Sequence, residues 1–470
     1  MTFRSFLLSA GLLLPATLSA AAAPAAIWIC STEETPARVM PAPALEPARP
    51  EAPPAVRVAT DKTRQLIDGF GGCFNELGWQ AMAKLPPAAR AEILTRLFGD
   101  EGAAFTLARL PIGASDFALD GYSLADTPDD FALRHFSIER DRRHLIPFVR
   151  AAQSVRPDLR FWASPWSPPA WMKTNSSYSR GSLRWEPEIL RTYANYFVRW
   201  VEAYRAEGIP IYALTPQNEP NILNVYPTCL WTGPQLREFI ADHLGPTLRD
   251  RKIDVELWLG LNGDPLNQGD NANARLVTVL EDPRANAFLT GIAFQYDSRN
   301  QIATARELYT DKKLMQSETE CHRGDNSWSD ALQLYAAMKR YLDGGASAYF
   351  AWNMVLDETG NSTWNWKQNA LVTVHRDSGQ VVYNGEYHVL RHFSGFIKPG
   401  ARRVLTTGVW GDQIAFLNRD GSVVAVVANS SGQAHAFSLA VGGRGAADTV
   451  RVELPARSVN TFVVPVASGS

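Results

Sequence analysis

Short apolar runs alternate with longer amphipathic stretches along the chain, from about residue 60 to about residue 355. The runs are rich in β-branched and aromatic residues and have the length of buried strands. The stretches between them show the three-to-four-residue spacing of helices. Eight strands are predicted, at Leu66–Gly71, Ala104–Leu110, Leu159–Ala163, Ile211–Thr215, Val255–Gly260, Gly291–Gln295, Lys313–Ser317 and Ala346–Trp352. The helices predicted between them include Ala88–Leu97, Glu139–Ser154, Ile189–Glu207, Pro234–Arg251 and Asp330–Leu342.

This order of elements predicts an α/β fold, a (β/α)8 TIM barrel over residues 57–395. An open, doubly wound sheet has the same order of elements and is the alternative. Such sheets usually carry a glycine-rich phosphate-binding loop after an early strand, and the segment Gly69–Gly72 does not have that spacing. The closed barrel is therefore the preferred fold.

The pattern changes after Phe393 to short alternating runs separated by Gly, Asn or Asp. Such runs predict an appended small antiparallel β-sandwich over residues 396–470, to which residues 55–61 add a further candidate strand. Because no flexible Gly/Ser linker separates it from the barrel, we expect the two to pack together. The six C-terminal strands are predicted at Val404–Thr407, Gln413–Asn418, Ser422–Asn429, His435–Val441, Thr449–Leu454 and Ser458–Val464.

Residues 1–23 have the pattern of a signal peptide: one basic residue, Arg4, then an apolar stretch and a run of small residues. We therefore expect a secreted or periplasmic protein. The stretch is too short for a membrane span, and no later one approaches the roughly 20 apolar residues that a span needs, so stable membrane insertion is not expected. Residues 24–56 are rich in Pro, Ala and Glu without a period and predict a flexible lead-in.

Composition narrows the choice of partners. The 46 Lys and Arg nearly balance the 48 Asp and Glu, and a net charge of −2 offers no electrostatic basis for binding nucleic acid. The 4 Cys and 8 His show no metal-ligand spacing, so neither a metal nor a cofactor is expected, and whether two cysteines pair stays open. The 14 Trp and 14 Tyr suit stacking on sugar rings, although they fill large cores equally well. We expect a monomer.

Polar residues stand at the ends of most predicted strands. In a (β/α)8 barrel the carboxyl ends of the strands share one rim, where the active site of such enzymes lies. A ring of polar strand ends is hard to explain by solubility alone and predicts a functional site. The strand-end residues are Arg109, Ser164-Pro165-Trp166, Asn218-Glu219-Pro220, Gln295-Tyr296-Asp297, Glu318 and Trp352-Asn353.

Two of these residues, Glu219 and Glu318, are candidates for the acid/base and the nucleophile of a glycosidase. Glycoside hydrolysis with retention uses two carboxyl groups about 5–5.5 Å apart, one protonated and one ionised. Repulsion between two such groups raises the pKa of one of them, which supplies the acid at neutral pH. Glu320 would share the strand face of Glu318 and is the alternative nucleophile.

The motifs around these residues resemble glycoside hydrolase family 30, which includes glucosylceramidases and β-1,6-glucanases. Asn-Glu-Pro at 218–220 and Ser-Glu at 317–318 are marks of the larger clan of barrel glycosidases. The resemblance runs from about residue 60 to the end of the chain and implies a barrel, a sandwich and retaining chemistry. The segments that carry it are Ile67–Gly72, Arg109–Phe117, Ala163–Asn175 and Tyr387–Pro399.

The resemblance also implies which side chains bind the sugar. Asn218 would hydrogen-bond the 2-hydroxyl, and Arg109 would orient the nucleophile. Asp116, Trp166 and Trp352 would bind the glucosyl unit. Packing in the barrel wall is an equally good explanation of the two tryptophans, since barrel rims need aromatic packing in any case. The residues implied in this way are Arg109, Asp116, Trp166, Asn218 and Trp352, and Tyr296 and Trp366 complete the expected substrate-binding set.

The segment after the sixth strand bears on the substrate. Glucosylceramidases carry a His-Trp-Tyr group there, whereas this chain has Phe294–Asp297. That segment and Met315–Cys321 resemble the β-1,6-glucanase branch more closely, and the loop Trp364–Asn369 adds two Trp and several amides near the expected mouth of the site. The expected substrate is therefore a β-glucan or β-glucoside, with β-1,6 linkages preferred, and glucosylceramide is the alternative.

Two rival functions differ in what they require. A non-catalytic carbohydrate-binding barrel would be expected to lose one carboxylate, and both are present. A metal-dependent barrel hydrolase needs a cluster of His and Asp at the strand ends, which this sequence lacks. The glycosidase is therefore the preferred function.

Overall fold

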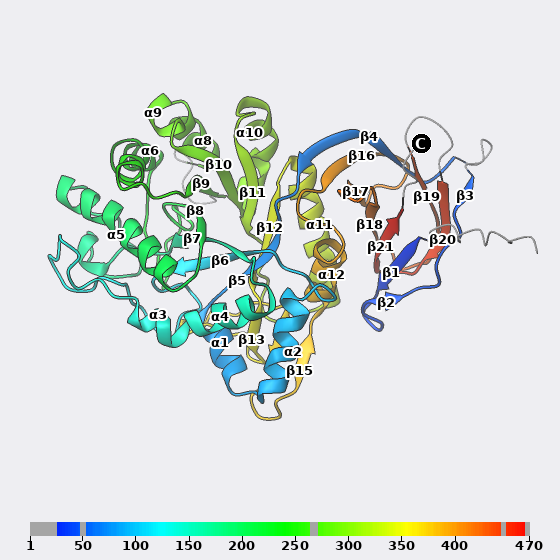
Figure 1. The fold of residues 1–470 in the computed structure, drawn as a ribbon, viewed down its shortest axis with the longest axis horizontal. Helices are drawn as coiled ribbons and strands as arrows, with labels where there is room; N and C mark the ends of the chain where they lie inside the picture. The colour runs from blue at the N-terminus through cyan, green and yellow to red at the C-terminus, as the bar shows by residue number, and fades with distance from the viewer. Residues whose placement is uncertain (1–25, 48–52, 264–270, 443–447, 466–470) are drawn as a thin grey trace, which may run out of the picture.

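The computed structural model describes residues 26–47, 53–263, 271–442 and 448–465, and it shows a barrel beside a sandwich (Figure 1). The predicted signal peptide, residues 1–23, lies outside the described residues. Within the described part of the chain, no helix is both long enough and apolar enough to cross a membrane.

Eight parallel strands form the barrel sheet, in the order β11-β10-β9-β8-β7-β6-β5-β12. Strands that follow one another in the chain are therefore neighbours in the sheet, and helices surround them on the outside (Figure 1). The α/β barrel expected from the sequence is confirmed, and every predicted strand overlaps an observed one. The strands are β5 (Gly69–Cys73), β6 (Leu107–Ile112), β7 (Arg160–Pro165), β8 (Ile211–Leu214), β9 (Glu256–Asn262), β10 (Leu289–Gln295), β11 (Lys313–Glu318) and β12 (Ala348–Asn353).

A side-chain amide helps to close the barrel between β11 and β12. Gln316 of β11 is fully buried, and its Nε2 donates to the backbone oxygen of Phe350 at 3.2 Å. The backbone N–H of Phe350 donates in turn to Gln316 Oε1 at 2.6 Å. Just below, Ser347 N donates to Leu314 O at 2.7 Å. Gln316 thus replaces ladder hydrogen bonds that the two backbones do not make directly.

Most of the helices begin at a side-chain cap or at a proline. Asn75 caps α1 by accepting a hydrogen bond from Gly78 N at 2.7 Å. The single helix predicted over Glu139–Ser154 is wrong, because the helix is interrupted at Leu145. A new helix starts there with Pro147 in its first turn, where the missing N–H of proline is tolerated. The helices are α1 (Glu76–Ala83), α2 (Pro87–Phe98), α3 (Glu139–His144), α4 (Ile146–Val155), α5 (Pro187–Ala206), α6 (Gly233–Glu238), α7 (Gly245–Asp250), α8 (Ala272–Leu280), α9 (Pro283–Asn286), α10 (Ile302–Leu308), α11 (Trp328–Gly344) and α12 (Gly385–Ser394), with a π-helical turn at Phe239–Leu244.

The sandwich is built from both ends of the described chain. Its strands follow the order β2-β1-β21-β18-β17-β16-β4-β19-β20-β3. A separate three-stranded sheet leads from β12 to α12 and comprises β13 (Val355–Asp357), β14 (Val372–Val374) and β15 (Val381–Tyr383). The sandwich strands are β1 (Ile27–Ser31), β2 (Arg38–Val39), β3 (Glu46–Pro47), β4 (Val56–Leu66), β16 (Arg402–Gly408), β17 (Gln413–Leu417), β18 (Val423–Asn429), β19 (His435–Val441), β20 (Asp448–Leu454) and β21 (Ser458–Val464).

The flexible lead-in expected over residues 24–56 is wrong for its described strands. Along its whole length, β1 pairs antiparallel with β21, and Trp28 is buried there. The Trp28 ring stacks on Phe462 with 5.7 Å between centroids, and its Nε1 donates to Asn460 Oδ1 at 3.0 Å. Five residues of strand inside a Pro-rich region give no periodic pattern, so only the partner strand reveals them.

The sandwich packs on the barrel through α11 and α12, as expected from the lack of a flexible Gly/Ser linker between them. His392 of α12 lies in this joint, with Nδ1 at 2.8 Å from Thr461 Oγ1 and Nε2 at 2.8 Å from Ser31 Oγ. Burial lowers the pKa of His392 to about 3, so the ring is neutral and donates from one nitrogen. Sandwich residues such as Phe416 and Val426 share one hydrophobic core with the barrel helices.

Deleting residues 400–470 is expected to prevent the barrel from folding into a soluble protein. The deletion would expose the apolar faces of α11 and α12 that the sandwich covers, at a cost of about 25 cal/mol for each Å² of apolar surface. Soluble yield, far-UV circular dichroism and glycosidase activity measure the effect. Removing only residues 466–470, which follow β21, is the control. A soluble, fully active truncation at residue 399 would contradict this prediction.

Candidate active site

Arg109, in β6, lies at the centre of the strand-end residues. Its guanidinium forms an ion pair with Glu318, and its Nη2 donates to Asn218 Oδ1 at 2.6 Å and to Ser164 Oγ at 2.9 Å. The guanidinium carbon lies 4.5 Å from the centroid of the Trp166 ring. Burying a cation is costly without such partners. This one connects residues at the carboxyl ends of β6, β7, β8 and β11.

Glu318 ends β11 and is 3 % exposed. Beside Arg109, its Oε2 accepts from Gln295 Nε2 at 3.2 Å, and its Oε1 accepts from Tyr296 OH at 3.2 Å. Both carboxylate oxygens are therefore held by donors from neighbouring strand ends. Charge-assisted hydrogen bonds of this kind fix the orientation of a carboxylate.

Glu219 follows β8 and lies at the same rim. Its Oε2 accepts from Tyr226 OH at 3.1 Å, and its Oε1 accepts from Asn262 Nδ2 at 3.3 Å. Burial, and after it the negative charge of Glu318, raises the pKa of Glu219 to about 8. Glu219 therefore carries a proton at neutral pH. The site joins a protonated carboxyl group to a carboxylate paired with an arginine.

Two residues of the site have a backbone conformation that L-residues rarely adopt. Glu219 and Tyr296 both have φ of 45°, in the left-handed region. Each such residue costs on the order of 1–3 kcal/mol, and the surrounding structure must hold it in place. The N–H of Glu219 donates to Gln295 Oε1 at 3.4 Å, and the backbone oxygen of Tyr296 accepts from Tyr341 OH at 3.1 Å. Such strain is typical of functional sites, where it aims side chains that ordinary backbone would turn away.

Asp116, Trp166 and Trp352 form a buried wall beside Arg109. The two indole rings stack with 5.0 Å between centroids, and Trp352 Nε1 donates to Asp116 Oδ2 at 3.3 Å. Asp116 Oδ1 and Asn262 Oδ1 are buried and have no hydrogen-bond partner among the residues that the structure describes. Burial, followed by the charges of the two glutamates, raises the pKa of Asp116 well above its usual range. Unpartnered buried acceptors are costly, and ligand hydroxyl groups would satisfy them.

Trp366 lies at the outer edge of the group. It is 44 % exposed, and its ring centroid is 6.4 Å from that of Tyr226, which binds Glu219. Two of the three amides in the same loop are buried and form hydrogen bonds within the protein. Gln368 Oε1 accepts from Asn353 Nδ2 at 2.7 Å, and Asn369 holds the backbone of a neighbouring loop. The third amide, that of Asn365, is exposed, so the expected role of the loop amides stays a prediction for that residue.

The structure separates Glu320 from Glu318. Glu320 forms an ion pair with Arg299, and its side chain is 28 % exposed. Glu318 contacts Arg109, whereas Glu320 turns away, because its own backbone is left-handed with φ of 47°. Alternation along a regular strand would have put both on one face, but β11 ends at Glu318. Glu320 therefore lies outside the group of contacting residues.

The nine candidate residues named from the sequence are linked by contacts into one group. It also includes Ser164 and Gln295, already named as strand-end residues, and Asn262 and Tyr226, which the sequence analysis did not name. Asn262 ends β9, so the rule that singled out Glu318 could have found it. Tyr226 lies in a loop, where no pattern marks it. All four cysteines are unpaired. In the described ranges, no three His, Cys, Asp or Glu are arranged to hold a metal ion.

Two family models match the chain, one for each part of the fold. The model described as "Glycosyl hydrolase family 30 TIM-barrel domain" matches residues 67–397. The model described as "Glycosyl hydrolase family 30 beta sandwich domain" matches residues 400–462. Together they span the barrel with its strand-end residues and the C-terminal strands of the sandwich.

Individual relatives agree with these matches. The mouse (Mus musculus) lysosomal acid glucosylceramidase is 31% identical over 436 residues, covering 86% of this chain and 82% of its own. An endo-1,6-beta-D-glucanase of Neurospora crassa is 29% identical over 397 residues, covering 78% and 80%. The crystal structure of SrfJ from Salmonella typhimurium superposes with a TM-score of 0.84 and 26% identity, covering 94% of this chain and 99% of that one. On the strength of both models and these relatives, the chain is a glycoside hydrolase and belongs to glycosyl hydrolase family 30.

Proposed function

We propose that the protein is a retaining β-glycosidase in which Glu318 is the nucleophile and Glu219 is the general acid/base. The observation that carries this proposal is the difference between the two carboxyl groups. Glu318 is paired with the Arg109 guanidinium, whereas burial and the nearby charge keep a proton on Glu219. Double displacement needs one group in each state, with the carboxyl groups about 5–5.5 Å apart.

In the first step a lone pair of a Glu318 oxygen attacks the anomeric carbon, and the bond to the leaving oxygen breaks. Glu219 transfers its proton to that oxygen, so the leaving group departs as a neutral alcohol and a glycosyl ester remains on Glu318. In the second step Glu219, now a carboxylate, takes a proton from water as the water oxygen attacks the same carbon. The ester bond breaks, and both carboxyl groups return to their starting states.

The other residues bind and orient the sugar. Asn218 Oδ1 accepts from Arg109 and from Gln295, and its Nδ2, which donates to Glu219 Oε2 at 3.4 Å, has a second hydrogen to donate to the sugar 2-hydroxyl. The unpartnered Asp116 Oδ1 would accept a hydroxyl proton of the same sugar, and Trp352 would pack against its ring. These residues are buried, so the sugar that becomes bound to Glu318 would sit deep in the barrel.

We propose a soluble β-glucan or β-glucoside with β-1,6 linkages as the preferred substrate. The leaving group lies on the side of Glu219, because that residue protonates its oxygen. On this side solvent exposure increases from Tyr226, which is buried, to Trp366, which is exposed. The Trp366 ring offers a platform for a further sugar unit. The likeness to a fungal endo-1,6-beta-D-glucanase and the Gln295 that stands at the end of β10 support this choice.

One observation favours glucosylceramide as the alternative substrate. Leu223 and Val225, in the loop that carries Tyr226, are 54 % and 50 % exposed. Exposed apolar side chains beside the leaving-group position suit a lipid tail better than a further sugar unit. The likeness to the mouse lysosomal acid glucosylceramidase points the same way.

Comparing kcat/KM on gentio-oligosaccharides and on detergent-dispersed glucosylceramide distinguishes the two substrates. We expect at least a tenfold preference for the oligosaccharides. Replacing Trp366 with Ala should lower their kcat/KM by a factor of about 2 to 10, the size of one aromatic contact. The matched variant Leu223→Ser should leave it unchanged. A preference for the lipid, lowered by Leu223→Ser, would overturn the substrate proposal and leave the two-glutamate mechanism intact.

A further inference from the structure

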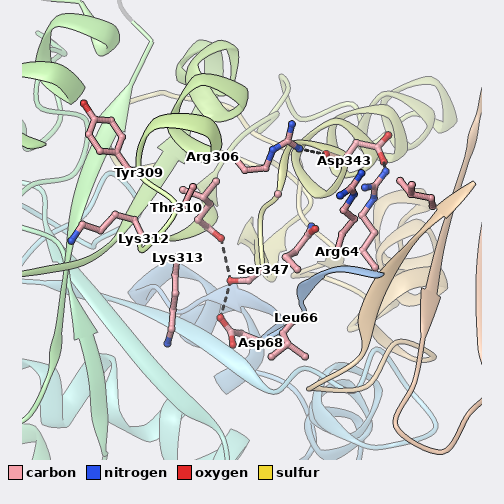
Figure 2. A pocket seen from close by; sticks show the side chains of 15 residues that line it. Arg64, Leu66, Asp68, Arg306, Tyr309, Thr310, Lys312, Lys313, Asp343 and Ser347 are labelled. Atoms are coloured by element: carbon pink, nitrogen blue, oxygen red, sulfur yellow. Dashed lines mark hydrogen bonds and ion pairs between the residues drawn. The ribbon is translucent and has the colours of Figure 1, made fainter. Parts of the chain in front are cut away.

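A cavity lies at the end of the barrel opposite the catalytic residues, where the amino ends of the strands meet the sandwich. Its volume is about 710 Å³. Tyr309, Lys312 and Lys313, beside the start of β11, line one side, and Arg64 of β4 lines the other near Asp343 (Figure 2). Neither the catalytic step nor the sugar-binding residues use this cavity.

Positive charge predominates among the residues that line the cavity. Five cationic side chains stand against two carboxylates, those of Asp68 and Asp343. Both carboxylates are engaged, since Asp68 Oδ2 accepts from Ser347 Oγ at 2.7 Å and Asp343 accepts from Arg403 at 2.6 Å. Arg403 is paired with Asp343, and both lysines are paired with carboxylates outside the cavity, so the remaining positive charge is that of Arg64 and Arg306 against Asp68 alone. This small excess of positive charge attracts an anion.

Three arginines retain donors for such an anion. Arg64 is exposed, and its guanidinium has no partner among the described residues. Arg403 Nε is buried and unpartnered, although its Nη2 binds Asp343. Arg306 uses Nη1 for the backbone oxygens of Asp343 and Gly344, each at 3.2 Å. The two lysines, by contrast, are paired with carboxylates outside the cavity.

Neutral groups and the size of the cavity point to more than an inorganic ion. One water molecule occupies about 30 Å³, so the volume of the cavity is far larger than one small inorganic anion needs. Tyr309 offers a half-buried ring for stacking, and Thr310 beside it offers a hydroxyl group. Guanidinium forks, by their geometry, match the oxygens of a phosphate group.

We propose that this cavity binds a phosphorylated saccharide, with the phosphate on Arg64, Arg306 and Arg403 and the sugar against Tyr309. The ligand would be either a free sugar phosphate or a phosphate ester on a larger glycan, since both present the same chemistry. Because the site lies at the joint, binding would tie the barrel to the sandwich.

Calorimetric titration of the full chain with glucose 6-phosphate, inorganic phosphate and glucose tests the proposal. We expect glucose 6-phosphate to bind at least tenfold more tightly than either of the others. Replacing Arg64 with Gln should weaken it about tenfold, as expected for one lost charge-assisted hydrogen bond. Arg57→Gln, on the same strand but outside the cavity lining, should bind as the wild type does. A phosphorylated glucan oligosaccharide in a parallel titration separates the two sources of the ligand.

Hydrolysis of an aryl β-glucoside by the Arg64→Gln variant should equal that of the wild type, which shows that the variant is folded. Equal binding of glucose 6-phosphate by wild type and Arg64→Gln would overturn the proposal. Glucose or inorganic phosphate binding as tightly as glucose 6-phosphate would overturn it too, because the cavity would then not recognise both halves of the ligand.

Discussion

Replacing Glu318 with Gln is expected to lower kcat for β-glucoside hydrolysis by a factor of about 10⁴ to 10⁶, the scale seen when a catalytic nucleophile is removed. Glutamine fills the same space but cannot form the glycosyl ester. The substitution also removes the negative charge that pairs with the Arg109 guanidinium. Initial rates on an aryl β-glucoside and on a gentio-oligosaccharide measure the loss, and both substrates should lose activity, because both pass through the ester.

Glu320→Gln is the matched control for this prediction. The residue lies two positions further on and pairs with Arg299, so its replacement should change kcat by less than twofold. The thermal midpoint of each variant shows whether it is folded. A Glu318→Gln variant that keeps a tenth of the activity, or a Glu320→Gln variant that loses it, would assign the nucleophile elsewhere.

Replacing Glu219 with Gln is expected to lower kcat/KM by a factor of about 10² to 10⁴ on substrates with a poor leaving group. An aryl glucoside with an acidic leaving group needs little protonation in the first step, so its cleavage should be affected far less. The glycosyl ester on Glu318 should then accumulate, because water is no longer deprotonated in the second step. A burst of released phenol followed by slow turnover is the expected measurement.

The pH dependence of the same variant provides an independent test of the role of Glu219. The group acts as an acid, so activity requires its protonated form. Because its pKa is raised to about 8, wild-type kcat/KM should hold through neutral pH and fall as the pH rises through that value. In Glu219→Gln this alkaline decline should disappear. An unchanged alkaline limb in the variant would assign the titrating group to another residue.

The strand ends show how far sequence reasoning reached at the site. Arg109, Asn218 and Glu318 could be placed together because parallel strands of a barrel end at one rim, whatever their separation in sequence. The same rule could not separate Glu318 from Glu320, because the backbone turns just after β11. Tyr226, which binds Glu219, comes from a loop and carried no pattern at all.

The N-terminal strand shows a second limit. Residues 27–31 pair with β21, more than 400 positions later in the chain, and nothing in a Pro-rich neighbourhood announces such a partner. The role of the Gln316 amide between β11 and β12 could not be predicted either, because a buried Gln in an apolar strand does not alter the hydrophobic pattern in a recognisable way. Both depend on a contact with a distant segment.

By itself, the sequence determined the barrel and the appended strands and singled out two candidate glutamates, because hydrophobic period and strand-end chemistry are local properties of the chain. Only the tertiary structure decided which groups touch. It paired Glu318 with Arg109, raised the pKa of Glu219 by burial, turned the amides of Gln368 and Asn369 inward, and opened a cationic cavity at the joint. The physical reason is that hydrogen bonds, burial and charge act over a few ångströms, and those distances are set by packing between segments far apart in the chain.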